Sequence, residues 1–274
     1  MRVWLKIEWE RMLKSRLVYI SLLIGFVIAI IQIIGEVYPR AVNPLKYYSG
    51  KVGEPFSLYM FSMSMNTGSL YKEIFITIFP VLAMLPHALS YHMDVKSGYI
   101  KNVYIKTKKI NYLIAKYIVT FVSAGITVIV PYIFNLIIAA CMLPALNPIR
   151  NGQYISGGAM LQELYYSKPL VYIFIYLIIN FLYAGAFATT ALAASYYVDN
   201  IFMLSMVPFV LWYGINVISQ YTVKTYHYNI SPMKLVDIAQ GYIVRPVPVI
   251  SVLVVVALLS AVVYFLNGVK SDVY

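Results

Sequence analysis

The chain has 274 residues, of which 61% are apolar and only 11% are charged. Soluble domains usually carry about 25% charged residues, so this composition excludes a water-soluble globular protein and requires a surface that faces lipid. The formal net charge of +11 would suit a nucleic-acid binder. The basic residues flank apolar stretches, however, which membrane topology explains better, and we expect no nucleic-acid partner.

The first segment, residues 1–16, predicts an amphipathic helix that lies on the membrane surface before the chain turns into the first span. In a helix one face is apolar and consists of Leu5, Trp9, Met12 and Leu13. Another face is charged, with ion-pair spacing, and consists of Lys6, Glu10 and Lys14. The alternative is an ordinary charged flank without a fixed structure.

Apolar blocks of roughly 20 residues follow, which is the length that crosses about 30 Å of hydrocarbon as a helix. The predicted spans are 17–35, 74–90, 111–143, 169–198, 201–220 and 246–266. Lipid cannot satisfy exposed backbone polar groups, so an open chain crosses it only as helices. The sequence therefore predicts an all-α, polytopic membrane protein, with about six transmembrane helices in a single transmembrane domain of residues 1–274.

The basic residues also predict an orientation. Segments 1–16 and 91–110 are the two dense clusters of lysine and arginine, and both lie on the cytoplasmic side if the N-terminus does. An even number of spans then places both termini in the cytoplasm.

Residues 91–110 join the second and third predicted spans and form an ordered pattern. Asp94 and Lys96 come first, the pair Ser97-Gly98 follows, and a basic stretch that includes Lys101 and Lys106 extends to Lys109. Gly98 permits a tight turn or a close backbone contact. The third span then opens with Tyr112 and Lys116.

In this order the residues resemble the type-2 exporter permeases of the ATP-binding-cassette (ABC) transporters. In that family the second span is followed by an acidic residue, a Ser/Thr-Gly pair and a short basic helix, and an aromatic residue and a lysine lead into the third span. The resemblance implies that 91–110 is a cytoplasmic coupling helix that docks on an ATPase subunit. The ATPase-coupling residues would be Asp94, Lys96, Ser97, Gly98, Lys101 and Lys106.

The resemblance also implies partners, a location and a cargo. The partners would be two copies of an ABC ATP-binding subunit, a second permease subunit that is identical or related, and membrane lipid. The location would be a bacterial-type cell (plasma) membrane. The most plausible cargo is an amphipathic peptide, such as an antimicrobial or toxin peptide, with lipids, drugs and saccharides behind it.

Several catalytic patterns are absent from the sequence. There is no Gly-x-x-x-x-Gly-Lys-Ser/Thr phosphate loop, no HExxH and no nucleophile elbow. We therefore expect a transport subunit that is not an enzyme and binds no cofactor or metal, with ATP and Mg held by the partner. His87 and His92 are expected to be solvated, and Cys141, the single cysteine, is expected to be a small buried apolar residue.

The predicted span centres contain no Asp, Glu, Lys or Arg, which argues against proton coupling. Polar residues remain that could bond helices together or line a pathway, and we favour the first role: Gln32, Asn135, Asn180 and Asn216. An ATP-independent channel or a membrane assembly factor is the alternative function. An intramembrane enzyme comes third, because no cluster of suitable residues is present.

Three smaller features of the sequence also predict local structure. Ser231, Pro232 and Gly241 predict a short capped helix just before the last span. The small residues between 184 and 194 predict a close helix contact. Prolines should kink the spans at four positions: Pro80, Pro86, Pro131 and Pro208.

Overall fold

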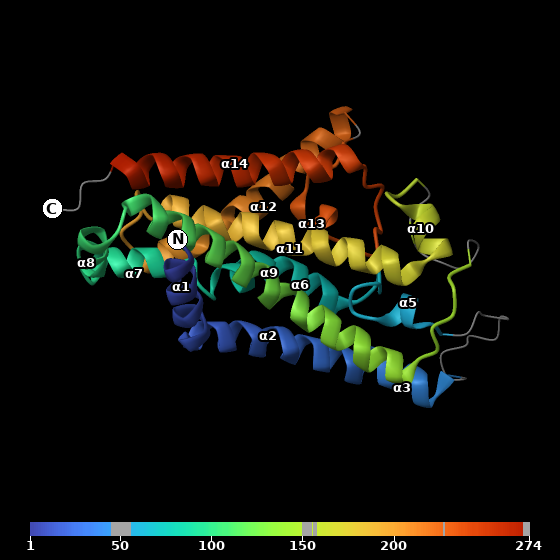
Figure 1. The fold of residues 1–274 in the computed structure, drawn as a ribbon. Helices are drawn as coiled ribbons and strands as arrows, with labels where there is room; N and C mark the ends of the chain where they lie inside the picture. The colour runs from blue at the N-terminus through green and yellow to red at the C-terminus, as the bar shows by residue number, and fades with distance from the viewer. Residues whose placement is uncertain (45–55, 150–154, 156–157, 227, 271–274) are drawn as a thin grey trace.

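A computed structural model describes residues 1–44, 56–149, 155, 158–226 and 228–270, and these residues form helices without any strand. The long helices run alongside one another in one elongated bundle (Figure 1). Helices α7 (Ser90–Lys96) and α8 (Tyr99–Lys106) lie at one end, here named the α8 end. Helix α10 (Gln162–Ser167) lies at the opposite end, here named the α10 end. The predicted all-α architecture is confirmed.

Five stretches within the described residues are long and apolar enough to cross a membrane, one fewer than the sequence predicted. The first, Arg16–Val42, comprises α2 (Arg16–Gln32), η1 (Ile33–Val37) and α3 (Tyr38–Val42). The others are α9 (Lys109–Met142), α11 (Pro169–Ala194), α12 (Ile201–Tyr226) and α14 (Pro246–Lys270). The protein is therefore a multi-pass membrane protein.

The predicted second span, 74–90, is not one continuous helix. Helix α6 (Leu70–Met84) has only 15 residues, and α7 begins after a turn at residues 85–89. Pro86 lies in that turn and lacks an N–H, so it cannot continue the backbone ladder of α6. Pro80 and Pro131 remain within α6 and α9, and Pro208 remains within α12.

Helix α11 is the centre of the bundle and contacts α9, α14, α6 and α12. It can do so because small residues line its buried surface, including Ala184, Gly185 and Ala188. Gly185 lies under the ring of Phe121 from α9, and Gly125 of α9 lies under the ring of Phe181 from α11. The predicted close helix contact is thus a reciprocal one between α9 and α11.

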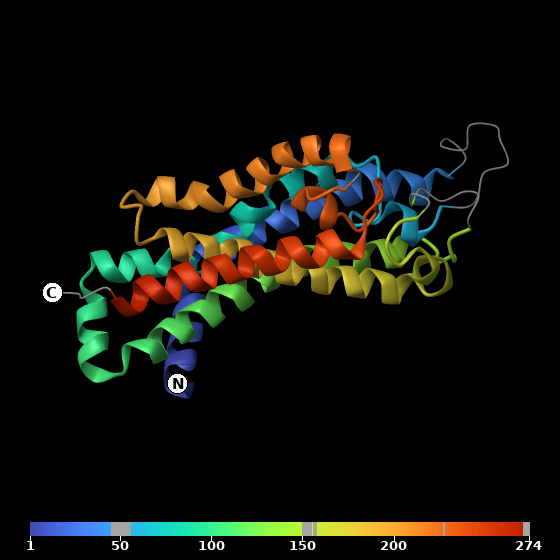
Figure 2. The ribbon, with the colours of Figure 1, turned by 90° about the horizontal axis from the view of Figure 1, so that it is seen from above.

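Two short helices run across the bundle instead of along it. Helix α1 (Arg2–Lys14) and helix α8 both lie roughly perpendicular to the long helices in two views at right angles (Figures 1 and 2). Ser15 separates α1 from α2, and its Oγ accepts a hydrogen bond from the N–H of Leu17 at 3.3 Å. Where the long helices cross a membrane, helices perpendicular to them run parallel to its plane.

Only part of the predicted apolar face of α1 packs against other apolar residues. Met12 is buried against Val18 and Val119, with Leu5 and Trp9 packed at the edge of this cluster. Leu13 is instead 46% exposed. On the charged face, Lys6 and Glu10 form the expected pair, 4.0 Å apart.

Towards the α10 end, the chain before α14 folds back against the bundle. Helix α13 (Pro232–Leu235) begins at the predicted proline but ends well before Gly241, so that glycine does not terminate it. Tyr172 donates a hydrogen bond to the carbonyl of Ile238 at 2.6 Å. A buried ion pair between Lys72 and Asp237, with 2.9 Å between Nζ and Oδ1, fixes the same segment to α6.

Cys141 is near the end of α9 and its side chain is exposed, which contradicts the expectation of a buried apolar residue. Cys141 is the second-to-last residue of α9, so it lies at a helix end and not in the middle of the span.

Candidate functional site

A buried cluster of charged side chains joins α1, α7 and α9 near the α8 end of the bundle. At its centre, Lys116 of α9 contacts two carboxylates, with its Nζ 2.7 Å from Oε2 of Glu8 and 2.7 Å from Oδ2 of Asp94. Lys116 and Glu8 have no exposed surface, and Asp94 is only 2% exposed. We call Glu8, Arg11, Asp94 and Lys116 the charge cluster.

Arg11 is the second cation of the charge cluster. Its Nη1 donates to Glu8 Oε1 at 2.8 Å and to Asp94 Oδ2 at 3.0 Å, and its Nη2 donates to Asp94 Oδ1. The guanidinium therefore grips Asp94 with two nitrogens, which is the strong and directional form of this contact. Two carboxylates and two cations face one another, so the cluster is electrically balanced.

Two neutral side chains also contact the carboxylates of the charge cluster. Tyr112 donates its hydroxyl to Asp94 Oδ2 at 2.5 Å, and Nε2 of His87 lies 3.0 Å from Glu8 Oε2. His87 and His92 are each only 4% exposed, so the expectation that they are solvated is wrong. His87 is buried because it lies in the turn at residues 85–89 and its ring contacts Glu8 of α1.

The cluster keeps its carboxylates ionised despite their burial. Burial alone would raise the pKa of Glu8, but its hydrogen bond with His87 and the charge of Lys116 outweigh that effect and lower the pKa to about 2. Burial likewise opposes ionisation of Asp94, yet the hydrogen bond from Arg11 and the charge of Lys116 lower its pKa below the usual value. Both carboxylates, Glu8 and Asp94, are therefore ionised at neutral pH.

The cluster is placed where it can link movements of separate segments. Asp94 lies in α7, four residues before Gly98, and Gly98 adopts the left-handed conformation, with a φ of 70°, at the start of α8. A displacement of α8 would therefore act on Asp94 and, through Arg11 and Lys116, on α1 and α9 together. Buried ionic networks suit this role because they tolerate few alternative arrangements.

The residues predicted to couple to an ATPase fall into two groups. Asp94 is within the charge cluster, while Lys96 donates to the carbonyl of Asp199 at 2.6 Å and Ser97 donates to the carbonyl of Asp94 at 3.4 Å. Lys101 and Lys106, in contrast, have exposed side chains on α8. Lys96 and Ser97 are also exposed, but they make these hydrogen bonds with the protein's own backbone.

Helix α8 is amphipathic, and its buried side holds it in place. Ile100 and Val103 are buried in a cluster with Tyr91, Tyr112 and other residues. The opposite side exposes Lys101, Ile105 and Lys106, and Ile105 is 83% exposed. The exposed side of α8 is thus positively charged and also carries the apolar side chain of Ile105.

The residues suggested for a pathway mainly bond protein segments together. Asn135 of α9 donates to Gln32 Oε1 at 2.7 Å and accepts from the N–H of Met63 at 2.8 Å. Asn180 donates to the carbonyl of Val236 at 3.0 Å, and Asn216 accepts from Ser231 Oγ at 2.6 Å. These contacts are what the favoured bonding role requires.

Glu8 and Arg11 are functional candidates that only the structure identifies. A signal was present, because Glu8 follows Leu5 by three residues and precedes Met12 by four, which places it on the apolar side of the helix. A carboxylate at such a position needs a partner. The family resemblance is what singles out Lys116 in the sequence, although a lysine within a predicted span also needs a partner.

Gly98→Ala should lower the free energy of unfolding by about 1–2 kcal/mol, because a Cβ is disfavoured in the left-handed conformation. No atom lies within 4 Å of the position of this Cβ, so backbone strain is the expected cause. Gly241→Ala is the matched control, since that site is equally open and its φ is not positive. Equal effects of both substitutions on thermal unfolding in detergent would contradict this account.

The fold and the charge cluster define a helical, multi-pass membrane protein with a polar junction at one end. The chain matches no protein-family model, no curated protein and no solved structure.

Proposed function

We propose that this chain is the membrane-spanning permease subunit of an ATP-driven ABC exporter. Two such subunits would form the pathway, and two ATP-binding subunits would dock at the α8 end, on the cytoplasmic side with both termini. ATP and Mg would be bound by those partners. An amphipathic peptide is the cargo that the resemblance favours, with lipids, drugs and saccharides behind it.

The observation that carries the proposal is the connection between α8 and the membrane helices. Helix α8 lies across the end of the bundle and exposes Lys101, Ile105 and Lys106. Behind it, Asp94 is bonded to Arg11 of α1 and to Lys116 of α9. A partner that pushes on α8 would therefore move a surface helix and a 34-residue membrane helix at the same time.

The test is co-purification of an ATPase with the tagged chain from its native membrane. We expect ATPase activity in the wild-type material and a loss of roughly tenfold or more for Lys101→Glu/Lys106→Glu, because lysines steer and hold acidic partner groups. Lys168→Glu/Lys224→Glu is the matched control, since it makes the same charge change at exposed positions outside the α8 end.

Two results would overturn the proposal. If no ATPase accompanies the wild-type chain, an ATP-independent channel or a membrane assembly factor becomes the better explanation. If Lys101→Cys, in a Cys141→Ser background, reacts with an impermeant thiol reagent added outside intact cells, α8 faces the wrong side for an ATPase.

A further inference from the structure

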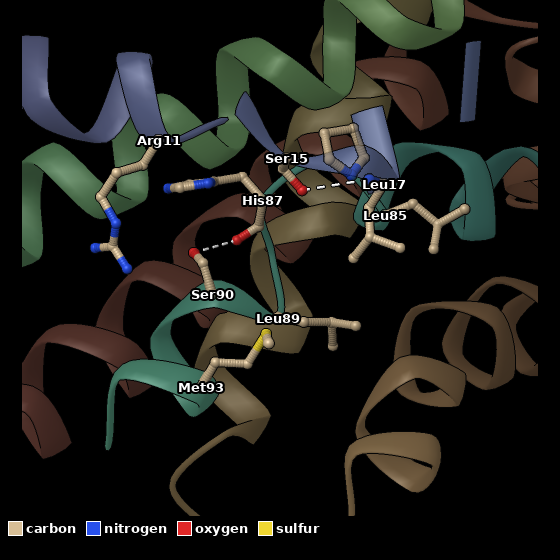
Figure 3. A pocket seen from close by; sticks show the side chains of 9 residues that line it. Arg11, Ser15, Leu17, Leu85, His87, Leu89, Ser90 and Met93 are labelled. Atoms are coloured by element: carbon tan, nitrogen blue, oxygen red, sulfur yellow. Dashed lines mark hydrogen bonds between the residues drawn. The ribbon is translucent and has the colours of Figure 1, made fainter. Parts of the chain in front are cut away.

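Beside the charge cluster lies an open cavity of about 180 Å³. It lies where α1 turns into α2 and where α6 breaks before α7, and its walls include Arg11, Ser15, Leu17, Leu85, Ser90 and Met93 (Figure 3). One water needs only about 10–15 Å³ by this kind of measure. The cavity therefore has room for a polar group much larger than a single water.

One wall of the cavity is polar and includes the guanidinium of Arg11. The Arg11 side chain is 35% exposed although it bonds both Glu8 and Asp94. A guanidinium has more N–H donors than these contacts use, so Arg11 can bond a further acceptor without releasing either carboxylate. Ser15 adds a hydroxyl group, whereas the hydroxyl of Ser90 already donates to the carbonyl of His87. Helix α2 begins directly after Ser15 with the positive end of its dipole.

The turn between α6 and α7 forms another part of the cavity wall. The turn at residues 85–89 interrupts the helix, with hydrogen bonds from Ala88 N to Met84 O at 3.1 Å and from Ser90 N to His87 O at 3.0 Å. Irregular backbone at membrane depth is tolerated where it is buried in protein or lines a polar cavity. Leu85, Pro86 and Leu89, which belong to this turn, all line the cavity.

The other wall is apolar and points to a lipid rather than to a soluble anion. Leu17, Leu85 and Met93 lie on it, and Met93 is 53% exposed at its rim. Helix α1 runs across the bundle (Figure 2), and the cavity lies where α1 turns into α2. A helix that crosses the long helices in this way suits a membrane surface, where lipid headgroups lie. A molecule with an anionic head and an apolar tail matches both walls at once.

We propose that this cavity binds the phosphate headgroup of an anionic phospholipid, with Arg11 as the principal contact and the start of an acyl chain against Leu17 and Met93. Arginine is suited to phosphate because its planar fork can bond two oxygens. The bound lipid would also hold α1 against α7, because Arg11 connects these two helices. The inference does not depend on the presence of an ATPase.

The experiment uses the full chain, reconstituted in phosphatidylcholine nanodiscs with or without phosphatidylglycerol. We expect phosphatidylglycerol to raise the thermal unfolding temperature and to remain bound to the protein in native mass spectrometry. Met93→Trp, which fills the rim without altering the charge cluster, should weaken lipid retention roughly tenfold. Met203→Trp is the control, because Met203 is a similarly exposed methionine, 63%, on α12.

Three other outcomes would contradict the lipid proposal, each in a different way. Equal retention by Met93→Trp and Met203→Trp would mean that lipid binds elsewhere. Equal stabilisation by phosphatidylcholine alone would exclude selectivity for an anionic headgroup. The same stabilisation by inorganic phosphate in phosphatidylcholine nanodiscs would show a soluble anion site instead of a lipid site. ATPase co-purification is measured separately, so this proposal and the permease proposal can fail independently.

Discussion

Glu8→Gln is expected to lower the free energy of unfolding by about 3–5 kcal/mol, whereas Glu10→Gln in the same helix should change it by less than about 1 kcal/mol. The two substitutions are chemically identical. Glu8 is completely buried against Lys116, while the Lys6–Glu10 pair is 4.0 Å long with side chains 80% and 53% exposed. Removal of one buried charge leaves its partner desolvated and unbalanced, and water cannot compensate.

A charge-balanced double substitution tests this explanation directly. Glu8→Gln leaves Arg11 and Lys116 facing Asp94 alone, whereas Glu8→Gln/Lys116→Met leaves one cation, Arg11, with one carboxylate, Asp94. We therefore expect the double variant to be more stable than Glu8→Gln, although it carries more changes. Detergent-based thermal or denaturant unfolding measures all three. If Glu8→Gln and Glu10→Gln have equal effects, the charge cluster does not stabilise the fold.

Gly125→Ala should lower the free energy of unfolding by about 1–3 kcal/mol, even though alanine favours a helix by about 1 kcal/mol over glycine. A Cβ at this position would lie 2.2 Å from Cδ2 of Phe181 and 2.4 Å from its Cε2. The contact is with the Phe181 ring between α9 and α11, so the ring must shift or the two helices must separate. Thermal unfolding in detergent again measures the effect.

Two further variants test whether close packing explains the effect of Gly125→Ala: one is a control and one restores space for the added Cβ. Gly214→Ala in α12 meets no atom within 4 Å, so it should be neutral or slightly stabilising through helix propensity. Gly125→Ala/Phe181→Leu removes the opposing ring and should recover part of the loss relative to Gly125→Ala. Destabilisation of the same size at Gly214 would show that glycine flexibility, and not close packing, determines the result.

The parts of the fold that the sequence predicted are those that depend on local physics. Spans such as 169–198 and 246–266 follow from length and apolar content, and α1 follows from the period of its apolar residues. Gly98 was expected to permit a turn because only glycine adopts such a conformation without strain. The break after Met84 was harder, because a proline within a span can either bend a helix or end it.

The charge cluster could not be assembled from the sequence, because its members are far apart along the chain. Glu8, Asp94 and Lys116 meet only after α1 has turned across the bundle and α7 has packed beside α9. No local sequence pattern predicts how α1, α7 and α9 are placed relative to one another. The family resemblance pointed to Asp94 and Lys116 separately, and the structure shows that they bond each other at 2.7 Å.

The exposed thiol of Cys141 can report which side of the membrane the end of α9 faces. Lys116 and Cys141 belong to the same helix and are about 38 Å apart along its axis at 1.5 Å per residue, which exceeds the hydrocarbon thickness of about 30 Å. A bulky polar reagent that cannot penetrate the bilayer therefore reaches this sulfur from one face only. Because the chain has a single cysteine, that face is read from the unaltered protein, and Glu8, Asp94 and Lys116 lie towards the other.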